Sequence, residues 1–195
     1  MTTITIEPAT ADRFDDAQHA LSGGGDGYGC QCQWWMMPNS EWQKTSREDR
    51  EGRLRDEIDA GPPPALIAYV DGEAAGWVRV GPRTRQVRIS RTRTLAAHSE
   101  EPWDDDSVWT VSCFVVRKDH RKQGLNARLL DAAIDYARRS GARVIEAYPL
   151  DPGAGKKIPV NDLYHGVLST FEDAGFREVA RPQPHLAIVS LELAE

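Results

Sequence analysis

The chain has 195 residues, of which 40% are hydrophobic, and a formal net charge of −6. This size suits a single α/β domain over residues 1–195, and the negative charge argues against general nucleic-acid binding. No apolar run approaches the roughly 20 residues that span a membrane. The first residues lack a secretion-signal pattern, and three cysteines do not predict a disulfide framework, so we expect a cytoplasmic protein.

The N-terminal segments predict a strand, a helix and an unusual loop. Residues 2–6 alternate polar and β-branched side chains, as a short strand does, and residues 13–21 predict a helix. Residues 23–38 then combine five glycines with aromatic and methionine side chains. Glycine makes this segment flexible, whereas its apolar side chains are unsuited to water. We therefore predict a loop that folds over a cleft.

The next segments predict a helical region and a hairpin. Asn39 or Ser40 can cap a helix, and Gln43 is placed to form a capping box with Ser40. The polar sequence that follows is interpreted as one helix or two. Residues 65–80 hold two apolar runs joined by Asp-Gly-Glu, which is a hairpin signal. Residues 86–90 are interpreted as a short strand within a solvated connector.

The centre of the chain predicts a buried strand followed by a phosphate-binding turn. Residues 108–116 are uncharged and rich in β-branched and aromatic side chains, which predicts a strand covered on both faces. Residues 117–123 carry five basic side chains, and apolar residues recur at helical spacing after Gly124. Because a helix N-terminus presents unpaired amides and the positive end of its dipole, this turn suits an anionic phosphate.

The C-terminal part predicts two more strands and a last helix. Residues 143–148 form a strand long enough to pair in parallel beside residues 108–116. Residues 161–174 predict a helix that ends at Gly175, and residues 186–193 predict a closing strand. The predicted order is strand, helices, hairpin, strand, helix, strand, helix, strand.

This pattern resembles the GNAT superfamily of acetyl-CoA-dependent N-acetyltransferases. Residues 121–126 followed by Leu129-Leu130 are similar to its pyrophosphate-binding motif, [Q/R]-x-x-G-x-[G/A], although Asn126 stands where Gly or Ala is usual. The element order and the Ala-Gly-Phe at residues 174–176 fit as well, so the resemblance covers nearly the whole chain. It implies an α/β GNAT fold with a mixed, splayed central sheet flanked by helices.

The resemblance also implies acetyl-CoA as the acyl donor. The pantetheine arm would lie between the strands at residues 108–116 and 143–148, and the pyrophosphate would sit on the amides of the turn. The cofactor-binding residues implied in this way are Phe114, Val115, Val116, Arg121, Lys122, Gln123, Gly124, Leu125 and Asn126.

The catalytic residues are less clearly marked. GNAT enzymes commonly take their acid from a Tyr five residues before the Phe of Gly-Phe, and this position holds Phe171. Tyr164, seven residues earlier and on the same face of the predicted helix, is our first choice for the acid. Ser169 is the alternative, as a hydrogen-bond donor to the sulfur. Glu146, a carboxylate inside an apolar strand, is the candidate base, and a salt-bridged structural role is equally open.

The segment Cys30-x-Cys32-x-Trp34-Trp35 is similar to a loop in a poorly characterised group of bacterial GNAT proteins. Zinc usually needs four ligands and nothing completes the set, so no metal is predicted. Tyr28, Trp34 and Trp35 are predicted to wall the acceptor site, where aromatic faces can hold an amine. The alternative is a hydrophobic cluster that anchors the loop. Cys113 is interpreted as core packing rather than as a nucleophile.

The sequence therefore predicts an N-acetyltransferase that moves an acetyl group to a primary amine of a small molecule by direct attack in a ternary complex. Two alternatives stay open: acetylation of a protein lysine or N-terminus, and a non-catalytic acyl-CoA-binding sensor, which Phe171 favours. The expected partner is a small-molecule amine, with no nucleic acid and no membrane, and a homodimer is left open.

Overall fold

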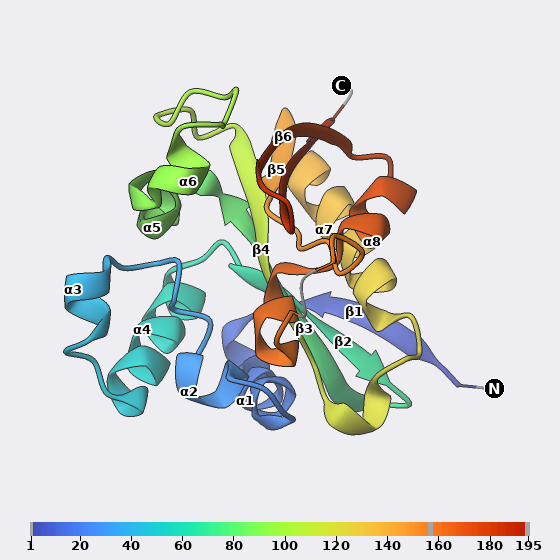
Figure 1. Cartoon of the computed structure of the whole chain (residues 1–195). Helices are drawn as coiled ribbons and strands as arrows, with labels where there is room; N and C mark the ends of the chain where they lie inside the picture. The colour runs from blue at the N-terminus through green and yellow to red at the C-terminus, as the bar shows by residue number, and fades with distance from the viewer. Residues whose placement is uncertain (1, 156–157, 194–195) are drawn as a thin grey trace.

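A sheet of seven strands forms the centre of the fold. The computed structural model describes residues 2–155 and 158–193. Within them the strand order is β1-β2-β3-β4-β5-β7-β6, with β4 and β5 parallel and the other neighbours antiparallel (Figure 1). The predicted α/β class with a mixed sheet is confirmed. The strands are β1 (Ile4–Pro8), β2 (Ala65–Val70), β3 (Glu73–Pro82), β4 (Val108–Val116), β5 (Val144–Ala147), β6 (Arg177–Gln183) and β7 (Leu186–Glu192).

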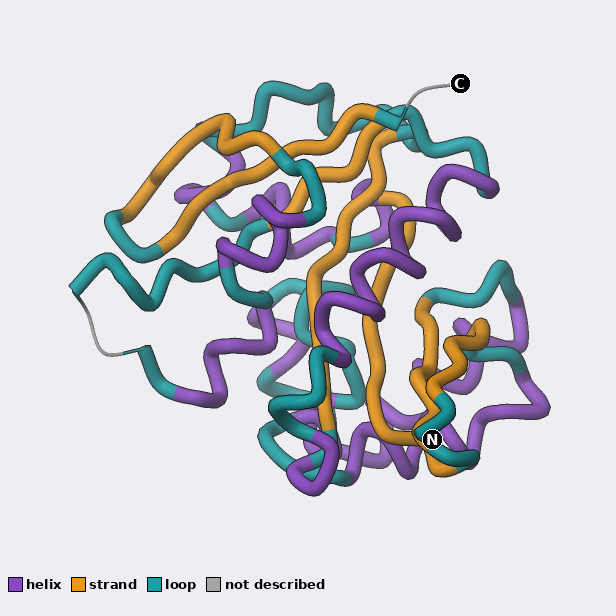
Figure 2. The backbone as a smooth tube through the Cα atoms, turned by 90° about the vertical axis from the view of Figure 1, so that its right-hand side faces the viewer, coloured by secondary structure: helices purple, strands orange, loops and turns teal. Residues whose placement is uncertain are grey.

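Helices cover both faces of this sheet (Figure 2). The α-helices are α1 (Phe14–Ser22), α2 (Gly27–Cys30), α3 (Asn39–Trp42), α4 (Arg47–Ala60), α5 (Val87–Arg91), α6 (Arg93–Ala96), α7 (Leu125–Arg139) and α8 (Leu168–Asp173). The 3-10 helices are η1 (Ala11–Arg13), η2 (Arg83–Arg85), η3 (Lys118–His120) and η4 (Val160–His165). In the described part of the chain, no helix combines the length and the hydrophobicity needed to cross a membrane.

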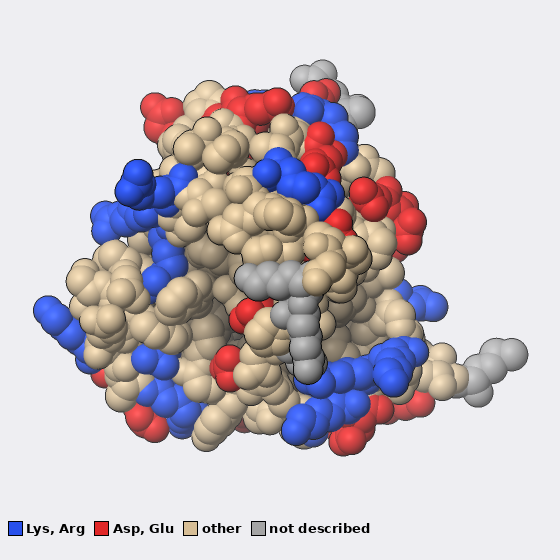
Figure 3. Space-filling model, in the orientation of Figure 1, with Lys and Arg blue, Asp and Glu red and all other residues tan. Residues whose placement is uncertain are grey.

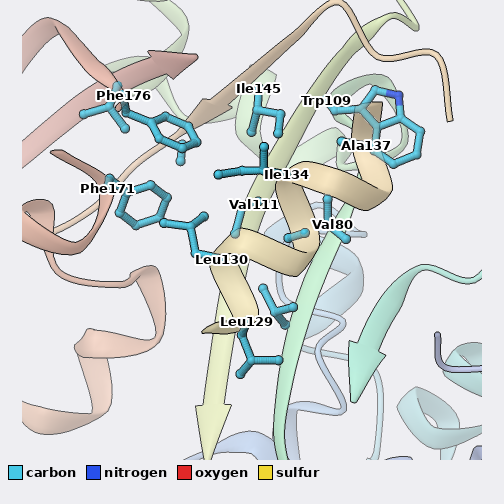
Figure 4. Close-up of a cluster of buried hydrophobic side chains, with 14 of the residues drawn as sticks. Val80, Trp109, Val111, Leu129, Leu130, Ile134, Ala137, Ile145, Phe171 and Phe176 are labelled. Carbon is cyan, nitrogen blue, oxygen red and sulfur yellow. The ribbon is translucent and has the colours of Figure 1, made fainter. Parts of the chain in front are cut away.

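Alternating side chains of the central strands build a core on each face of the sheet. In β2, Leu66 packs in the core beneath α7, whereas Ile67 packs in the core beneath α1 and α4. Figure 4 shows the α7 side, where Leu130 and Ile134 lie between the helix and Val111 of β4. Burial on both faces explains why these strands have nearly continuous apolar sequences.

A β-bulge at Ser112 changes which face of the sheet the end of β4 presents. The register pairs Arg79 with Cys113 but Val80 with Val111, so Ser112 is the extra residue. Val111 accordingly packs in the α7 core, while Cys113, only two residues later, packs in the α1 core. The bulge therefore turns the Cys113 side chain toward the α1 side of the sheet.

Strands β4 and β5 diverge after a short paired segment. They pair from Val108 opposite Val144 to Val111 opposite Ala147. Beyond this point β5 ends, whereas β4 continues to Val116 beside β3. The predicted parallel pairing is confirmed. Among the described residues, the last part of β4 has no strand partner on the edge that faces away from β3.

The predicted capping box is wrong. The helical region is two helices, and the box lies at the start of α4, where the Asp49 amide donates to Ser46 Oγ at 3.1 Å. The Ser46 amide donates in return to Asp49 Oδ2 at 2.8 Å. The helix that starts near Ser40 ends after four residues, so a box between Ser40 and Gln43 has no long helix to begin.

Two predicted secondary-structure elements are also wrong. Residues 87–91 form α5 rather than a strand, and Arg88 is buried there with its Nε donating to Met37 O at 3.0 Å. The predicted last helix is interrupted at Gly166, between η4 and α8. Gly166 has φ of 82°, and a Cβ there would lie 2.6 Å from the ring of Phe171. Only glycine fits this conformation and this space.

Candidate functional site

A cavity of about 950 Å³ opens on one face of the molecule. Its walls come from four segments. They are the glycine-rich loop (residues 23–38), the last four residues of β4, the basic turn before α7 (residues 117–123) and η4. Figure 3 shows this face hollowed near its centre, with a group of Lys and Arg side chains to the lower right of the hollow. The glycine-rich loop therefore folds over a cleft, as its composition predicts.

One end of the cavity is formed by backbone amides where α7 begins. Lys122 and Gly124 have φ of 62° and 73°, so the chain makes a tight left-handed turn into the helix. The first helical bond at this end runs from the Arg128 amide to Gly124 O at 3.3 Å. In the part of the chain that the structure describes, no side chain caps this helix. The amides of residues 122–126, which have no hydrogen-bond partner in this part of the chain, are therefore free to bind an anion.

Asn126 contributes an unpaired oxygen at the same end. Its side chain lines the cavity, and its Oδ1 is buried without a hydrogen-bond partner among the described residues. A buried acceptor of this kind is costly unless a ligand or water supplies a donor. The departure from the small residue of the GNAT motif thus leaves a buried oxygen without a partner beside the cavity.

The unpaired edge of β4 continues the cavity from this end. Phe114, Val115 and Val116 line it, as do Arg121, Lys122 and Leu125. Arg121 Nε donates to Val116 O at 3.2 Å, so this carbonyl is covered by an exposed side chain. Gln123 does not line the cavity, and its side chain donates to Asp119 O at 3.3 Å.

The glycine-rich loop forms the other end of the cavity, and buried polar side chains hold it. Trp35 Nε1 donates to Ser112 O, the carbonyl of the bulge, at 3.1 Å. Gln31 is fully buried, with bonds to Gln18 at 2.7 Å and to Tyr28 O at 2.8 Å. The predicted acceptor-site residues Tyr28, Trp34 and Trp35 all line the cavity. Their placement agrees with both predicted roles, walling a site and anchoring the loop.

Arginines already occupy one face of several aromatic rings at this end. The Arg88 guanidinium lies 3.7 Å from the centre of the Trp34 ring, and that of Arg47 lies 4.3 Å from the Tyr28 ring. A cationic acceptor would therefore have only the opposite face of each ring. This competition limits the contribution of cation–π contacts to binding an amine.

Tyr164 is the predicted catalytic residue that lines the cavity. It lies in η4 and is half-buried. Burial, followed by the proximity of the Cys113 and Cys30 sulfurs, raises the pKa of its phenol above the ordinary value. The phenol therefore keeps its proton at neutral pH and is available as a donor.

The structure places Glu146 and Ser169 away from this cavity. Glu146 is 1% exposed and pairs with Arg83 at 2.8 Å, with further bonds from Ser99 at 2.7 Å and Tyr148 at 2.6 Å. Ser169 is exposed on α8. Phe171 points into the core, edge-on to Phe176 at 5.1 Å between ring centres (Figure 4).

Sequence reasoning missed a cluster around Cys32. Cys32 lines the cavity, and its Sγ accepts hydrogen bonds from Trp77 Nε1 at 3.2 Å and from Arg79 Nε at 3.4 Å. Arg79 also binds both carboxylate oxygens of Glu57 at 2.8 Å. The available signal was an arginine inside the apolar run of β3, which needs a buried partner.

The chain is similar to known proteins in sequence pattern and in fold. The model of the acetyltransferase (GNAT) family matches residues 31–154. No curated protein matches the sequence. In the described residues, no group of three or more His, Cys, Asp or Glu side chains is arranged to hold a metal.

Several solved structures share the fold across almost their whole length. An N-acetyltransferase from Staphylococcus aureus superposes with a TM-score of 0.57 and 14% identity, covering 98% of this chain and 99% of that one. The ribosomal-protein-alanine N-acetyltransferase of Brucella melitensis gives 0.56 and 19%, covering 97% and 99%. The yncA protein of Salmonella typhimurium, solved with its cofactor acetyl-CoA, gives 0.54 and 18%, covering 98% and 95%. Identities this low show the fold alone.

Proposed function

Because the chain belongs to the GNAT acetyltransferase family, we propose that it is an acetyl-CoA-dependent N-acetyltransferase that acetylates a primary amine of a small molecule. The observation that carries this proposal is one continuous cavity. It joins the uncapped start of α7, the unpaired edge of β4 and the aromatic loop. We also propose that the protein is cytoplasmic. That it forms a homodimer stays a prediction.

The residues at the donor end fit a cofactor that carries a diphosphate and an extended amide-containing arm. The amides of Lys122 and of residues 124–126 would hold the diphosphate, with Arg121 and Lys122 adding positive charge. The edge of Phe114–Val116 would pair with the arm as a strand pairs with its neighbour, once Arg121 releases Val116 O.

The acceptor end favours a small molecule over a protein chain. The loop closes over the cavity, and Asn161 Nδ2 donates to Asp26 Oδ1 at 3.2 Å across its rim. In this proposal acetyl-CoA fills the donor end of the cavity and the amine fills the acceptor end. The amine can then attack the thioester carbonyl directly. Bringing donor and amine together in this way accounts for much of the rate enhancement expected of such enzymes.

Tyr164 is the proposed general acid. Its phenol is protonated and lines the cavity beside the end of β4, where it can donate a proton to the departing thiolate. Glu146 and Ser169 receive no catalytic part in this proposal, because one is sealed in a buried ion pair and the other is exposed on α8.

Release of free CoA from acetyl-CoA against a panel of amines tests the proposal. We expect turnover on small primary amines, and we expect Tyr164→Phe to lower kcat by about 100-fold while leaving the KM for acetyl-CoA near that of the wild type. Turnover on peptides alone would favour a protein acetyltransferase. Tight acetyl-CoA binding without turnover on any amine would instead indicate a sensor, and unchanged kcat in Tyr164→Phe would remove this residue from the mechanism.

A further inference from the structure

Three cysteines line the cavity, and Cys32 among them accepts a hydrogen bond from a buried arginine. The sulfur of Cys32 accepts N–H bonds from Trp77 at 3.2 Å and from Arg79 at 3.4 Å. Arg79 is 2% exposed and is fixed by its two 2.8 Å bonds to Glu57, so its Nε is held toward this sulfur. Cys32 itself is 3% exposed and lies at the cavity wall.

The fold holds Cys32 in place with an uncommon backbone. Gln31 and Cys32 are consecutive non-glycine residues with φ of 51° and 54°. Such a conformation is rare for residues with side chains and persists only where the surroundings fix it. Here the buried Gln31 amide supplies that restraint through its bonds to Gln18 and Tyr28. The strained turn presents the Cys32 sulfur to Trp77 and Arg79.

The three thiols differ in their protonation. Burial raises the pKa of Cys32, but the Cys113 thiol, the Arg79 charge and the Arg79 and Trp77 N–H donors outweigh burial and lower it below the ordinary value. Burial and the nearby Cys32 raise the pKa of Cys30 to about 11. The pKa of Cys113 is raised by its hydrogen bond to Cys32 and by burial. Of the three thiols in the cavity, Cys32 is therefore the one that loses its proton most readily.

We propose that Cys32 is a nucleophile that accepts the acyl group of a thioester bound in the cavity, which makes it a site of S-acylation in addition to amine acetylation. The choice of acetyl-CoA as donor rests on the proposed function. Cys113 and Phe114 on the β4 edge line the same cavity, so the thioester arm would end near this sulfur. A soft, charged sulfur is the strongest nucleophile among these side chains.

The reaction is an exchange of one thioester for another. The Cys32 thiolate attacks the carbonyl carbon, a new carbon–sulfur bond forms, and the bond to the CoA sulfur breaks. CoA leaves as a thiolate that takes a proton from Tyr164 or from water. Acylation removes the negative charge that faces Arg79 and fills the acceptor end of the cavity, so the acylated protein would bind an amine less well.

Mass spectrometry of the purified full chain tests the proposal. After incubation with acetyl-CoA alone, wild-type protein and Cys30→Ser should each gain one acetyl group, which fragmentation places on Cys32 and hydroxylamine removes. Cys32→Ser, checked for native circular dichroism and melting temperature, should gain the label at least about tenfold more slowly. Acetyl-CoA that binds in calorimetry but leaves Cys32 unmodified, or that modifies Cys30 instead, overturns the proposal.

A second donor separates this proposal from the proposed function. If calorimetry shows no binding of acetyl-CoA, the proposed function fails, whatever Cys32 does. The small thioester S-acetyl-N-acetylcysteamine lacks the diphosphate and does not need the amides of α7. Selective acetylation of Cys32 by this compound, lost in Cys32→Ser, supports the nucleophile on its own, and absence of such labelling overturns it.

Discussion

Two buried arginines lie a few residues apart at the end of β3 and are used differently. Arg83 is 2% exposed, and its terminal nitrogens bind Glu146, Ser99 and two backbone carbonyls of the segment before β4. Arg79 is equally buried and also binds a carboxylate at 2.8 Å, but its Nε faces the sulfur of a cavity residue. One ion pair is closed by its own neighbours, and the other contacts the sulfur of a residue that lines the cavity.

A charged residue buried at an apolar strand can therefore have either of two roles. Both arginines need partners, because a buried unpaired charge is costly. A closed network such as Arg83–Glu146 fixes a loop against the sheet and does not line the cavity. A network that includes a titratable side chain at a cavity, as Arg79 does with Cys32, changes the reactivity of that side chain.

Breaking the Arg83–Glu146 pair should have the largest effect on stability. Replacing Glu146 with Gln leaves the Arg83 charge buried without its carboxylate, and we expect a loss of about 3–5 kcal/mol in the free energy of unfolding. Urea denaturation followed by circular dichroism measures it. Glu100→Gln is the matched control, because Glu100 pairs with Arg177 at 3.2 Å on the surface and should change stability by less than about 1 kcal/mol.

The same variant tests whether Glu146 has only a structural role. The turnover of the remaining folded Glu146→Gln protein should equal that of the wild type, because the carboxylate does not line the cavity. A stable variant with greatly reduced turnover would return Glu146 to the role of base and contradict its structural interpretation.

Breaking the Arg79–Glu57 pair should lower stability less, but it should change the reactivity of Cys32. In Arg79→Met, Glu57 loses its partner, yet this carboxylate is 20% exposed and can recruit water. We expect a loss of about 2 kcal/mol in the free energy of unfolding. Because the Arg79 charge lowers the pKa of Cys32, its removal should raise that pKa, so the thiolate forms only at higher pH.

Alkylation of Cys32 by iodoacetamide at a series of pH values measures this change. In wild-type protein the rate should already be high at neutral pH and fall only on acidification, whereas in Arg79→Met the rise should move toward alkaline pH. The pKa of Cys30, raised to about 11 by burial and by Cys32, should keep its own rate low in both proteins. Superimposable profiles for Cys32 in the two proteins would show that Arg79 does not set its protonation.

The sequence predicted those parts of the fold that depend on local pattern. The strand at residues 108–116 is uncharged and flanked by charges, and its observed bounds agree with the prediction. The hairpin around Asp71-Gly72 and the start of α7 after Gly124 follow from turn residues and helical spacing. The short α5 and the break at Gly166 could not be predicted in this way. Tertiary contacts decide both: the Arg88 bond to Met37 O and the Phe171 ring against Gly166.

The sequence predicted residues that line the cavity where backbone forms the wall, and missed those that distant side chains hold in place. The amides before α7 and the edge of β4 follow from the motif and the predicted strand order. Glu146 was recognised as a carboxylate that needs an explanation, but its partner Arg83 lies 63 residues away. Cys32 and Arg79, 47 residues apart, meet because of the Gln31–Cys32 turn, which has no signature in the sequence.

Exposed cations at the donor end should have the smallest effect. Arg121 and Lys122 are exposed, in contrast to the buried arginines, and the unpaired amides of α7 remain when either is replaced. We expect Arg121→Gln to weaken acetyl-CoA binding by only about three- to tenfold, and by less at high salt, because water and ions screen the charge. Calorimetry at two salt concentrations measures both effects.

Lys118→Gln is the control, because it removes an exposed cation of the same turn that does not line the cavity, and it should change affinity less. Equal losses in the two variants would mean that the overall charge of the turn attracts the cofactor, without a local contact from Arg121.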